Sequence, residues 1–272
     1  MLMIDSKFFA GDCVVAAIGI DLQGKKHVLG LWHGASENAT VVKGLLEDLV
    51  SRGLDPERKL LIVIDGAKGL RKAVKRVLGE AALVQRCRIH KLRNVLDHLP
   101  EEKKAQAAWR LRAAWGHKDP KAAEKELRKT AQWLEPFSPM GAASLQEGLE
   151  ETRTVQRLGI DHTLCRSLSN TNLMENCFAQ ASHWTRRVKR WDGPRMILRW
   201  TAAALLSAEK HFRPIRGCEQ LKDLGKVLRE LETNSTLKAA WMKLENHLNF
   251  NYRRDISKKN PLCRARHKGY FL

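Results

Sequence analysis

The segment that most constrains the fold is the continuous apolar run Lys59–Ile64 (KLLIVI), which stops at Asp65-Gly66. A short, branched apolar run without polar alternation is typical of a strand buried on both faces, as in a parallel sheet covered by helices. Apolar residues at helical spacing over Asn38–Arg52 precede it, and a second helix is indicated over Ala67–Leu78. The pattern therefore predicts an α/β protein.

Four further segments complete the predicted sheet. A short apolar run, Leu2–Asp5, opens the chain, and Cys13–Asp21 and Lys26–His33 flank the turn sequence Leu22–Lys25 as in a hairpin. A short strand is indicated at Ala82–Gln85. Together with Lys59–Ile64 these segments predict a sheet of about five strands with flanking helices.

The pattern changes after this region. From Lys91 to about Leu158 the chain is rich in Ala, Lys, Glu and Trp without a strand signal, which indicates an all-helical insertion. A polar turn (SLSNTN) then starts a helix near Leu173, and Asp192-Gly193-Pro194 breaks it and starts another. The predicted organisation is 1–90 first part of the core, 91–167 insertion, 168–216 second part of the core, and 217–272 a helical appendage with a basic tail from Asn251.

Three tryptophans of the insertion have two interpretations. Trp109, Trp115 and Trp133 would stack on bases flipped out of DNA, or they would pack in the core between helices. Burial in a helical core is the more common role of such residues, and we expect it here.

Charge and composition limit the class of protein. The 49 Lys and Arg against 30 Asp and Glu give a formal net charge of +19, which favours a polyanionic partner such as nucleic acid, although a merely basic protein is the alternative. The six cysteines are too sparse for a disulfide framework and are expected to be reduced. No apolar run is long enough to span a bilayer and the start does not resemble a secretory signal, so we expect a cytoplasmic protein that is neither exported nor membrane-bound.

Three carboxylates form the candidate catalytic site. Asp5 and Asp65 are expected at the ends of two strands, where active sites of open α/β sheets gather, and Glu175 is expected in the first turn of a helix. Carboxylate oxygens are ligands for Mg²⁺, and two such ions support phosphodiester chemistry. The alternatives are that Asp65 only forms a turn, and that Glu175 completes a capping box with Asn172.

A Cys-x-x-His pair, Cys87 and His90, lies between the second and third carboxylates. With the reversed pair His162 and Cys165 it would supply the four ligands of a zinc site. The favoured alternative is that Cys87 is buried and that His90 packs or contacts DNA beside the active site.

Basic residues follow Glu175 closely. The helix that carries Glu175 is expected to continue through four of them, and a fifth follows the break, an arrangement suited to phosphate contacts, with a solvated helix face as the alternative. These expected DNA-binding residues are Arg186, Arg187, Lys189, Arg190 and Arg195.

Four segments, in this order, resemble the catalytic core of the Mutator-type insertion-sequence transposases over roughly residues 1–216: CVVAAIGIDLQGKKHVLGLWHG, LLIVIDGAKGL, VQRCRIHKLRNVLDHLP and LSNTNLMEN. The resemblance implies an RNase H-like core and a DDE site in which Asp5, Asp65 and Glu175 hold two Mg²⁺ ions, with Mn²⁺ as substitute. The spacings of 60 and 110 residues between these carboxylates agree with the family.

The resemblance also implies an activity and partners. It implies cleavage at transposon ends and transfer of the freed 3′-hydroxyl to target DNA, without a covalent enzyme intermediate, by a homodimer or higher oligomer. Two departures are Ser6, where the family often has Gly, and the four residues that precede Asp5, where the family has a DNA-binding region. The alternatives are therefore a truncated, non-catalytic DNA-binding remnant and an RNase H-like nuclease.

Overall fold

The computed structural model describes residues 1–36 and 38–234. Met1–Leu228 form one compact unit, and of the second unit, Arg229–Leu272, residues 229–234 are described. The basic tail expected from Asn251 lies outside the described residues. Within the described part of the chain, no helix is long and apolar enough to cross a membrane.

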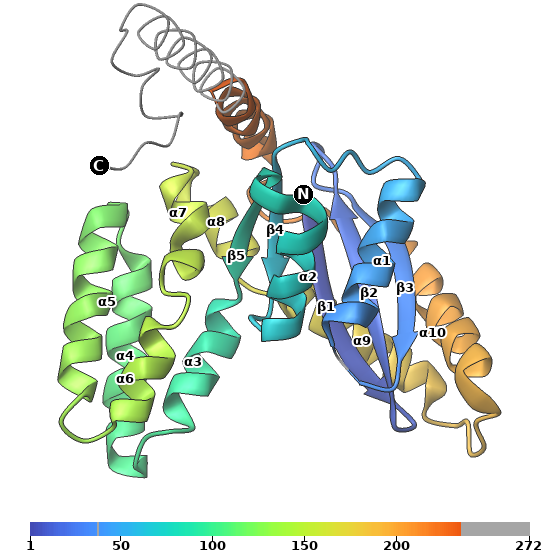
Figure 1. Cartoon of the computed structure of the whole chain (residues 1–272), viewed down its shortest axis with the longest axis horizontal. Coiled ribbons are helices and arrows are strands. Elements are labelled where there is room, and N and C mark those ends of the chain that lie inside the picture. Colours follow the sequence, from blue (N-terminus) through green and yellow to red (C-terminus); the bar gives the residue numbers. More distant parts are fainter. Residues whose placement is uncertain (37, 235–272) are drawn as a thin grey trace, which may run out of the picture. The chain divides into compact units, whose positions relative to one another are not determined.

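The sheet has five strands in the order β3-β2-β1-β4-β5 (Figure 1). Antiparallel pairing joins β1 to β2 and β2 to β3, and parallel pairing joins β1 to β4 and β4 to β5. The predicted mixed α/β class and the predicted number of strands are confirmed. The strands are β1 (Leu2–Phe9), β2 (Asp12–Ile20), β3 (Lys26–Gly34), β4 (Leu60–Ile64) and β5 (Ala82–Arg86).

The first strand is longer than its sequence pattern indicates. We expected Leu2–Asp5, but β1 continues to Phe9 and pairs with β2 along its whole length, from Leu2 opposite Gly19 to Phe9 opposite Asp12. Its parallel pairing with β4 stops at Ile4, so the second half lacks a neighbour on that side. Polar Ser6 and Lys7 are tolerated there because they are only half-buried, and this hides the strand from a search for apolar runs.

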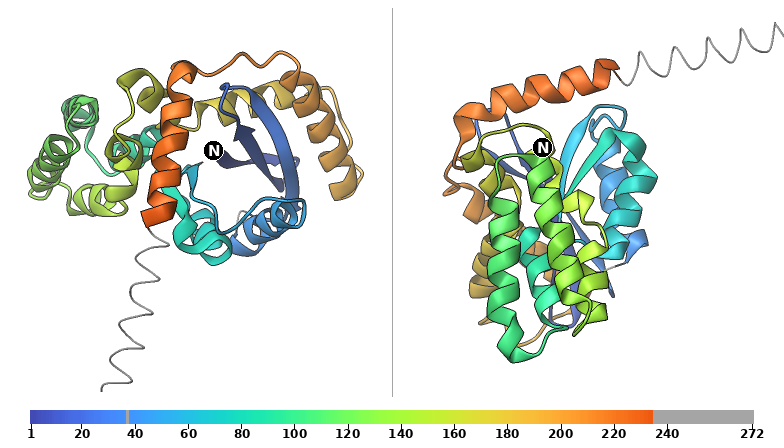
Figure 2. Two further views of the ribbon diagram at one scale, coloured as in Figure 1. Left: turned by 90° about the horizontal axis from the view of Figure 1, so that it is seen from above. Right: turned by 90° about the vertical axis from the view of Figure 1, so that its left-hand side faces the viewer.

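Helices cover both faces of the sheet (Figures 1 and 2). On one face, Leu2, Ile4 and Ile62 pack with α1 and α2. On the other, Met3 and Val63 pack with α9 and α10. Alternate residues of β1 and β4 thus serve two separate cores, which explains the continuous apolar run of β4. The covering helices are α1 (Ala39–Ser51), α2 (Lys68–Leu78), α9 (Asn172–Thr185) and α10 (Gly193–Glu209).

The segment between β5 and α9 is helical throughout, as predicted, and has an apolar core of its own. Trp115 is buried in this core and Trp133 packs against it, as expected, but Trp109 is 69% exposed and its predicted burial is wrong. Ala107, Leu111 and Ala114 form the buried side of the same helix, and Trp109 falls on the opposite side. The helices are α3 (Arg88–Leu96), α4 (Glu101–Gly116), α5 (Pro120–Leu134), α6 (Pro139–Gln146), α7 (Thr154–Arg157) and α8 (His162–Leu168).

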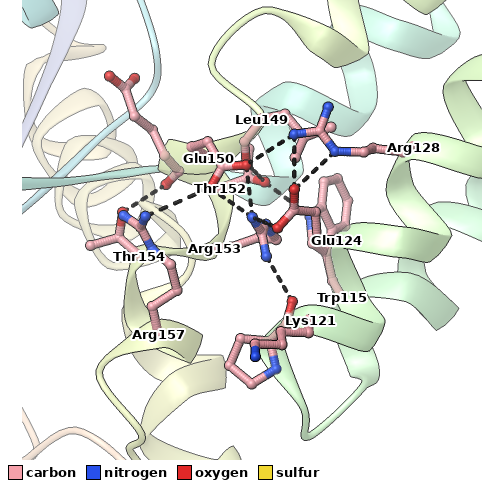
Figure 3. A network of polar contacts seen from close by, with 12 residues as sticks. Trp115, Lys121, Glu124, Arg128, Leu149, Glu150, Thr152, Arg153, Thr154 and Arg157 are labelled. Atoms are coloured by element: carbon pink, nitrogen blue, oxygen red, sulfur yellow. Dashed lines mark hydrogen bonds and ion pairs between the residues drawn. The ribbon is translucent and has the colours of Figure 1, made fainter.

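Two buried arginines form ion pairs, one that joins parts of the helical insertion to each other and one that joins the insertion to the sheet. Arg153 donates to Glu124 at 2.8 Å and to Glu150 at 2.6 Å, which joins α5 to the short turn Glu150–Arg153 (Figure 3). At the end of β5, the Arg86 guanidinium donates to Glu151 at 2.7 Å. Hydrogen bonds to charged groups in such partly buried places are stronger than exposed ones, so these contacts hold the insertion in register with β5.

Candidate active site

Asp5 and Asp65 are brought together by the parallel pairing of β1 with β4. The last paired residues are Ile4 and Ile64, so an aspartate follows immediately on each of two neighbouring strands. Alternation places Asp5 on the same face as Met3, which is the face covered by α9. Asp5 therefore lies at the end of the parallel pairing, although the expectation that it ends the strand itself is wrong.

Local backbone contacts orient both carboxylates. Oδ1 of Asp5 accepts a hydrogen bond from the Ser6 amide at 2.8 Å, and Oδ1 of Asp65 accepts one from the Ala67 amide at 2.8 Å. Asp65 thus forms the turn that was considered as its alternative role. Gly66 has a φ of 106°, a left-handed conformation that directs the chain from β4 into α2. A turn contact through one oxygen does not prevent a carboxylate from binding a ligand through the other.

Glu175 lies in the first turn of α9, as predicted. The alternative capping box is wrong, because Asn172 is the first helical residue, the N-cap is Thr171, and no side chain caps the helix. Instead, Oε1 of Glu175 lies 3.3 Å from Nη1 of Arg93 and 3.5 Å from Nε2 of His90. Both basic residues come from α3, so this helix and α9 meet at the carboxylates.

His90 is held in its charged form. A hydrogen bond with Cys87 is the main cause that raises its pKa to about 9, against the opposing effect of burial, and the negative charges of Asp5 and Asp65 add to the rise. Cys87 is fully buried, and although burial alone raises a thiol pKa, hydrogen bonds with His90 and Thr171 bring the pKa of Cys87 below its usual value. The favoured interpretation of this pair, with Cys87 buried and His90 beside the carboxylates, matches its position.

Sequence reasoning missed two members of this cluster. Arg93 lies one helical turn after His90 on α3, and this spacing of three residues would have placed it on the same side of the helix. Thr171 is buried, and its amide donates to the Cys87 sulfur at 3.4 Å. No sequence pattern indicates that contact, because the two residues are 84 positions apart.

The side chains of the three candidate residues are of the type that binds a hard divalent cation. Asp5, Asp65 and Glu175 supply only carboxylate oxygens, the ligand type that Mg²⁺ prefers. As their side chains are placed, no group of three or more His, Cys, Asp or Glu among the described residues is gathered closely enough to hold a metal ion. Glu175 contacts Arg93 and His90, and metal binding by all three carboxylates requires a rearrangement of the side chains.

Four of the five basic residues expected to bind DNA were predicted to continue the Glu175 helix, and they do not. Helix α9 ends at Thr185, where the Val188 amide closes a tight turn onto the Thr185 carbonyl, and the chain is non-helical until α10 begins at Gly193. The predicted continuation of the helix is therefore wrong for residues 186–190. All five side chains are exposed: Arg186, Arg187, Lys189 and Arg190 in this connection, and Arg195 in the first turn of α10.

An aspartate next along each of two parallel strands and a glutamate in the first turn of a covering helix define the class to which the fold and site belong, that of α/β proteins with carboxylates at the end of a parallel strand pair. The model of one family, described as "Transposase, Mutator family", matches residues 3–214. The chain belongs to this family, which confirms the resemblance seen in the sequence.

The curated relatives are described as transposases for insertion sequence elements. The transposase for insertion sequence element IST2 of Acidithiobacillus ferrooxidans is 29% identical over 78% of this chain and 70% of its own length. Transposases for ISRM5 of Rhizobium meliloti and for IS406 of Burkholderia multivorans are 32% and 30% identical over 73% and 74% of this chain. The chain spans only about half the length of these two relatives, 48% and 51%.

Proposed function

We propose that the chain carries the catalytic core for DNA cleavage and strand transfer in the transposition of an insertion sequence, with Asp5, Asp65 and Glu175 as a DDE site. The observation that supports this proposal most strongly is the register of β1 and β4, because an aspartate follows the last paired residue of each strand and Asp5 lies on the face covered by α9. Adjacent carboxylates in a partly buried place repel one another, and a shared cation offsets that repulsion. The five-stranded sheet with helices on both faces is compatible with an RNase H-like core.

Asp5, Asp65 and Glu175 would hold Mg²⁺ or Mn²⁺ in this site. Two bound divalent ions supply activation of the attacking oxygen and neutralisation of the leaving oxygen in a phosphodiester displacement. The chain's own residues contribute positioning and charge. Protonated His90 and Arg93 present positive charge beside the carboxylates, where a scissile phosphate must approach, and stabilise its added negative charge.

The exposed basic connection between α9 and α10 would bind the DNA backbone. Arg186, Arg187, Lys189 and Arg190 follow the helix that carries Glu175, and all four side chains are exposed to a partner. Neutralising phosphates releases counterions, which gives affinity without sequence specificity. Transposon ends and target DNA are the proposed partners, and a homodimer or higher oligomer the proposed active form.

Nicking of supercoiled plasmid in Mg²⁺ or Mn²⁺ tests the proposal without knowledge of the transposon ends, and strand transfer from pre-nicked terminal DNA of the element tests the complete reaction. Asp65→Asn should lower both activities by at least about a hundredfold. Asp55→Asn, at an exposed position in the loop before β4, is the matched control and should leave them unchanged. Equal activity of wild type and Asp65→Asn, or cleavage of RNA–DNA hybrids without strand transfer, would contradict the proposal.

A further inference from the structure

A cavity of about 840 Å³ is lined by residues of the helical insertion and of the segment that leads into α9. Its walls come from the start of α3, the end of α4, the segment from α7 to α8, and the residues that lead into α9. Arg88 in one wall precedes His90 by two residues, and Asn172 in the other precedes Glu175 by three. The cavity thus shares α3 and the start of α9 with the candidate active site.

Positive charge dominates the lining. Of the described residues that line the cavity, Asp161 is the one acid, and its Oδ2 already accepts the Thr163 amide at 2.8 Å as the N-cap of α8. The ligand that this charge favours is an anion. The lining cations are Arg88, Arg112, Lys118, Arg157 and Arg166.

Two polar atoms in the lining have hydrogen-bonding capacity left over. Nη2 of Arg88 is buried and has no nitrogen or oxygen partner among the described residues; the same guanidinium interacts with the Cys165 thiol, which also lines the cavity, and its Nε donates to the Thr152 carbonyl at 2.9 Å. Oε1 of Gln156 is likewise buried and unpartnered within the described part of the chain, while its Nε2 donates to the carbonyls of Trp115 and His117. Two side chains that line the cavity thus each contain a buried polar atom without a nitrogen or oxygen partner, a donor in Arg88 and an acceptor in Gln156.

The remaining wall is apolar. Ile89, Leu92 and Ile160 line the cavity together with Trp115, whose indole nitrogen donates to the Thr152 hydroxyl at 3.2 Å and whose ring lies 5.9 Å from the Arg88 guanidinium. A flat, apolar surface with one donor and one acceptor is complementary to a nucleobase, and basic residues at the rim are complementary to its phosphate. The volume lies within the range of about 300–1,000 Å³ found for small-molecule sites.

We propose that this cavity binds one unpaired nucleotide of the DNA strand, with the base inside against Arg88 and Gln156 and the phosphate at the basic rim. The proposal rests on the proposed function, since it takes DNA as the partner. A nucleotide that turns out of the double helix into this cavity, while it stays part of the strand, would fix the position of that strand relative to the carboxylates. The energy of unpairing is smallest at ends, nicks and mismatches, so such DNA should bind preferentially.

The test is a metal-free binding experiment with the full chain, in EDTA, so that catalysis does not contribute. One probe is a duplex with a single unpaired 2-aminopurine opposite an abasic site, and the other is the same duplex fully paired. The wild type should bind the first about tenfold more tightly and change its 2-aminopurine fluorescence, as expected for one base held against a protein wall. Free dAMP, added as competitor, distinguishes a nucleotide in DNA from a free nucleotide.

Variants assign the preference to the cavity. Arg88→Met should abolish it and leave affinity for paired DNA unchanged. Because Arg88 also contacts Thr152, circular dichroism and thermal melting must show that this variant folds, and Lys118→Gln at the exposed rim provides a second variant that leaves the buried contacts intact. Lys118→Gln should weaken binding of the unpaired probe, whereas Lys125→Gln, an equal loss of charge at an exposed position outside the cavity, should not.

Three results would overturn the proposal. These are equal affinity of the wild type for the two duplexes, a preference that persists in folded Arg88→Met and in Lys118→Gln, and binding of dAMP without any preference for unpaired DNA. If the wild-type chain does not nick plasmid DNA but still prefers the duplex with the unpaired base, only the proposed catalytic function is contradicted.

Discussion

Arg93 on α3 and Glu175 on α9 form an ion pair, with Nη1 and Oε1 3.3 Å apart, so the third candidate carboxylate already has a cationic partner. Both side chains are substantially exposed, at 57% and 37%. Exposed pairs of this kind are worth at most about 1 kcal/mol, so the contact is easily exchanged for another. We interpret Arg93 as a competitor of the cation for Glu175.

Arg93→Gln should therefore tighten Mn²⁺ binding, by about two- to fivefold, because Glu175 no longer has to leave its partner. The dissociation constant can be measured by electron paramagnetic resonance of free Mn²⁺. Lys104→Gln, which removes a similar pair with Glu101 in the insertion, is the control and should not change it. Unchanged or weaker Mn²⁺ binding by Arg93→Gln would exclude this competition.

The sequence predicts those parts of the site whose structure depends on a short segment of the chain. The run into Asp65-Gly66 predicts both a strand and its end, and Glu175 at the start of a helix follows from the polar turn before it. The continuation of β1 to Phe9 is not predictable in this way, because it depends on pairing with β2. The contacts of Glu175 with Arg93 and of Cys87 with Thr171 join residues more than 80 positions apart, and only the assembled fold shows them.

The basic connection between α9 and α10 should contribute nonspecific DNA affinity through phosphates. The double variant Arg187→Gln/Arg190→Gln should reduce the slope of log K against log salt concentration by about two, since each lost phosphate contact removes about 0.9. Fluorescence anisotropy with a random duplex at several salt concentrations measures this slope. A matched double variant on α5, Lys121→Gln/Lys125→Gln, loses the same charge from exposed positions and should keep the wild-type slope. Equal slopes for the two variants would place the DNA elsewhere.

A substitution at Gly148 tests how much the contact between Arg86 of β5 and Glu151 of the insertion contributes to stability. Gly148 has a φ of 65°, and a Cβ at this position would lie 2.6 Å from the Arg86 guanidinium, which pairs with Glu151. Gly159 has nearly the same φ, 67°, but a Cβ added there would meet nothing within 4 Å, so it isolates the backbone effect. Gly159→Ala should cost about 1 kcal/mol of unfolding free energy, and Gly148→Ala about 1–3 kcal/mol more because Arg86 is displaced. Urea unfolding checks both, and equal losses would show that Arg86 adapts without cost.

Lys91 should make the stability of the protein depend on pH above neutrality. Its Nζ is buried and donates to the carbonyls of Ser144 at 2.6 Å and Glu147 at 2.8 Å. Burial is the main cause that lowers its pKa from 10.5 to about 8, and the positive charge of Arg86 adds to it. A neutral amine keeps two N–H groups, enough for both carbonyls, so deprotonation removes the cost of a buried charge without breaking these contacts.

The sign of the effect follows from the two pKa values. Between pH 8 and pH 10.5 the unfolded chain holds the Lys91 proton and the folded chain does not, so the unfolding free energy rises with pH across this window, by about 2–3 kcal/mol from this residue. The cost of the charge is fully present below pH 8. Lys91→Met should lack this rise, whereas Lys125→Met at an exposed position should retain it. Urea unfolding at pH 7.5, 9 and 10 provides the comparison. Parallel pH profiles for wild type and Lys91→Met would mean that the buried amine keeps its proton and that the two carbonyls, together with the nearby Glu147 and Glu151 carboxylates, offset its burial.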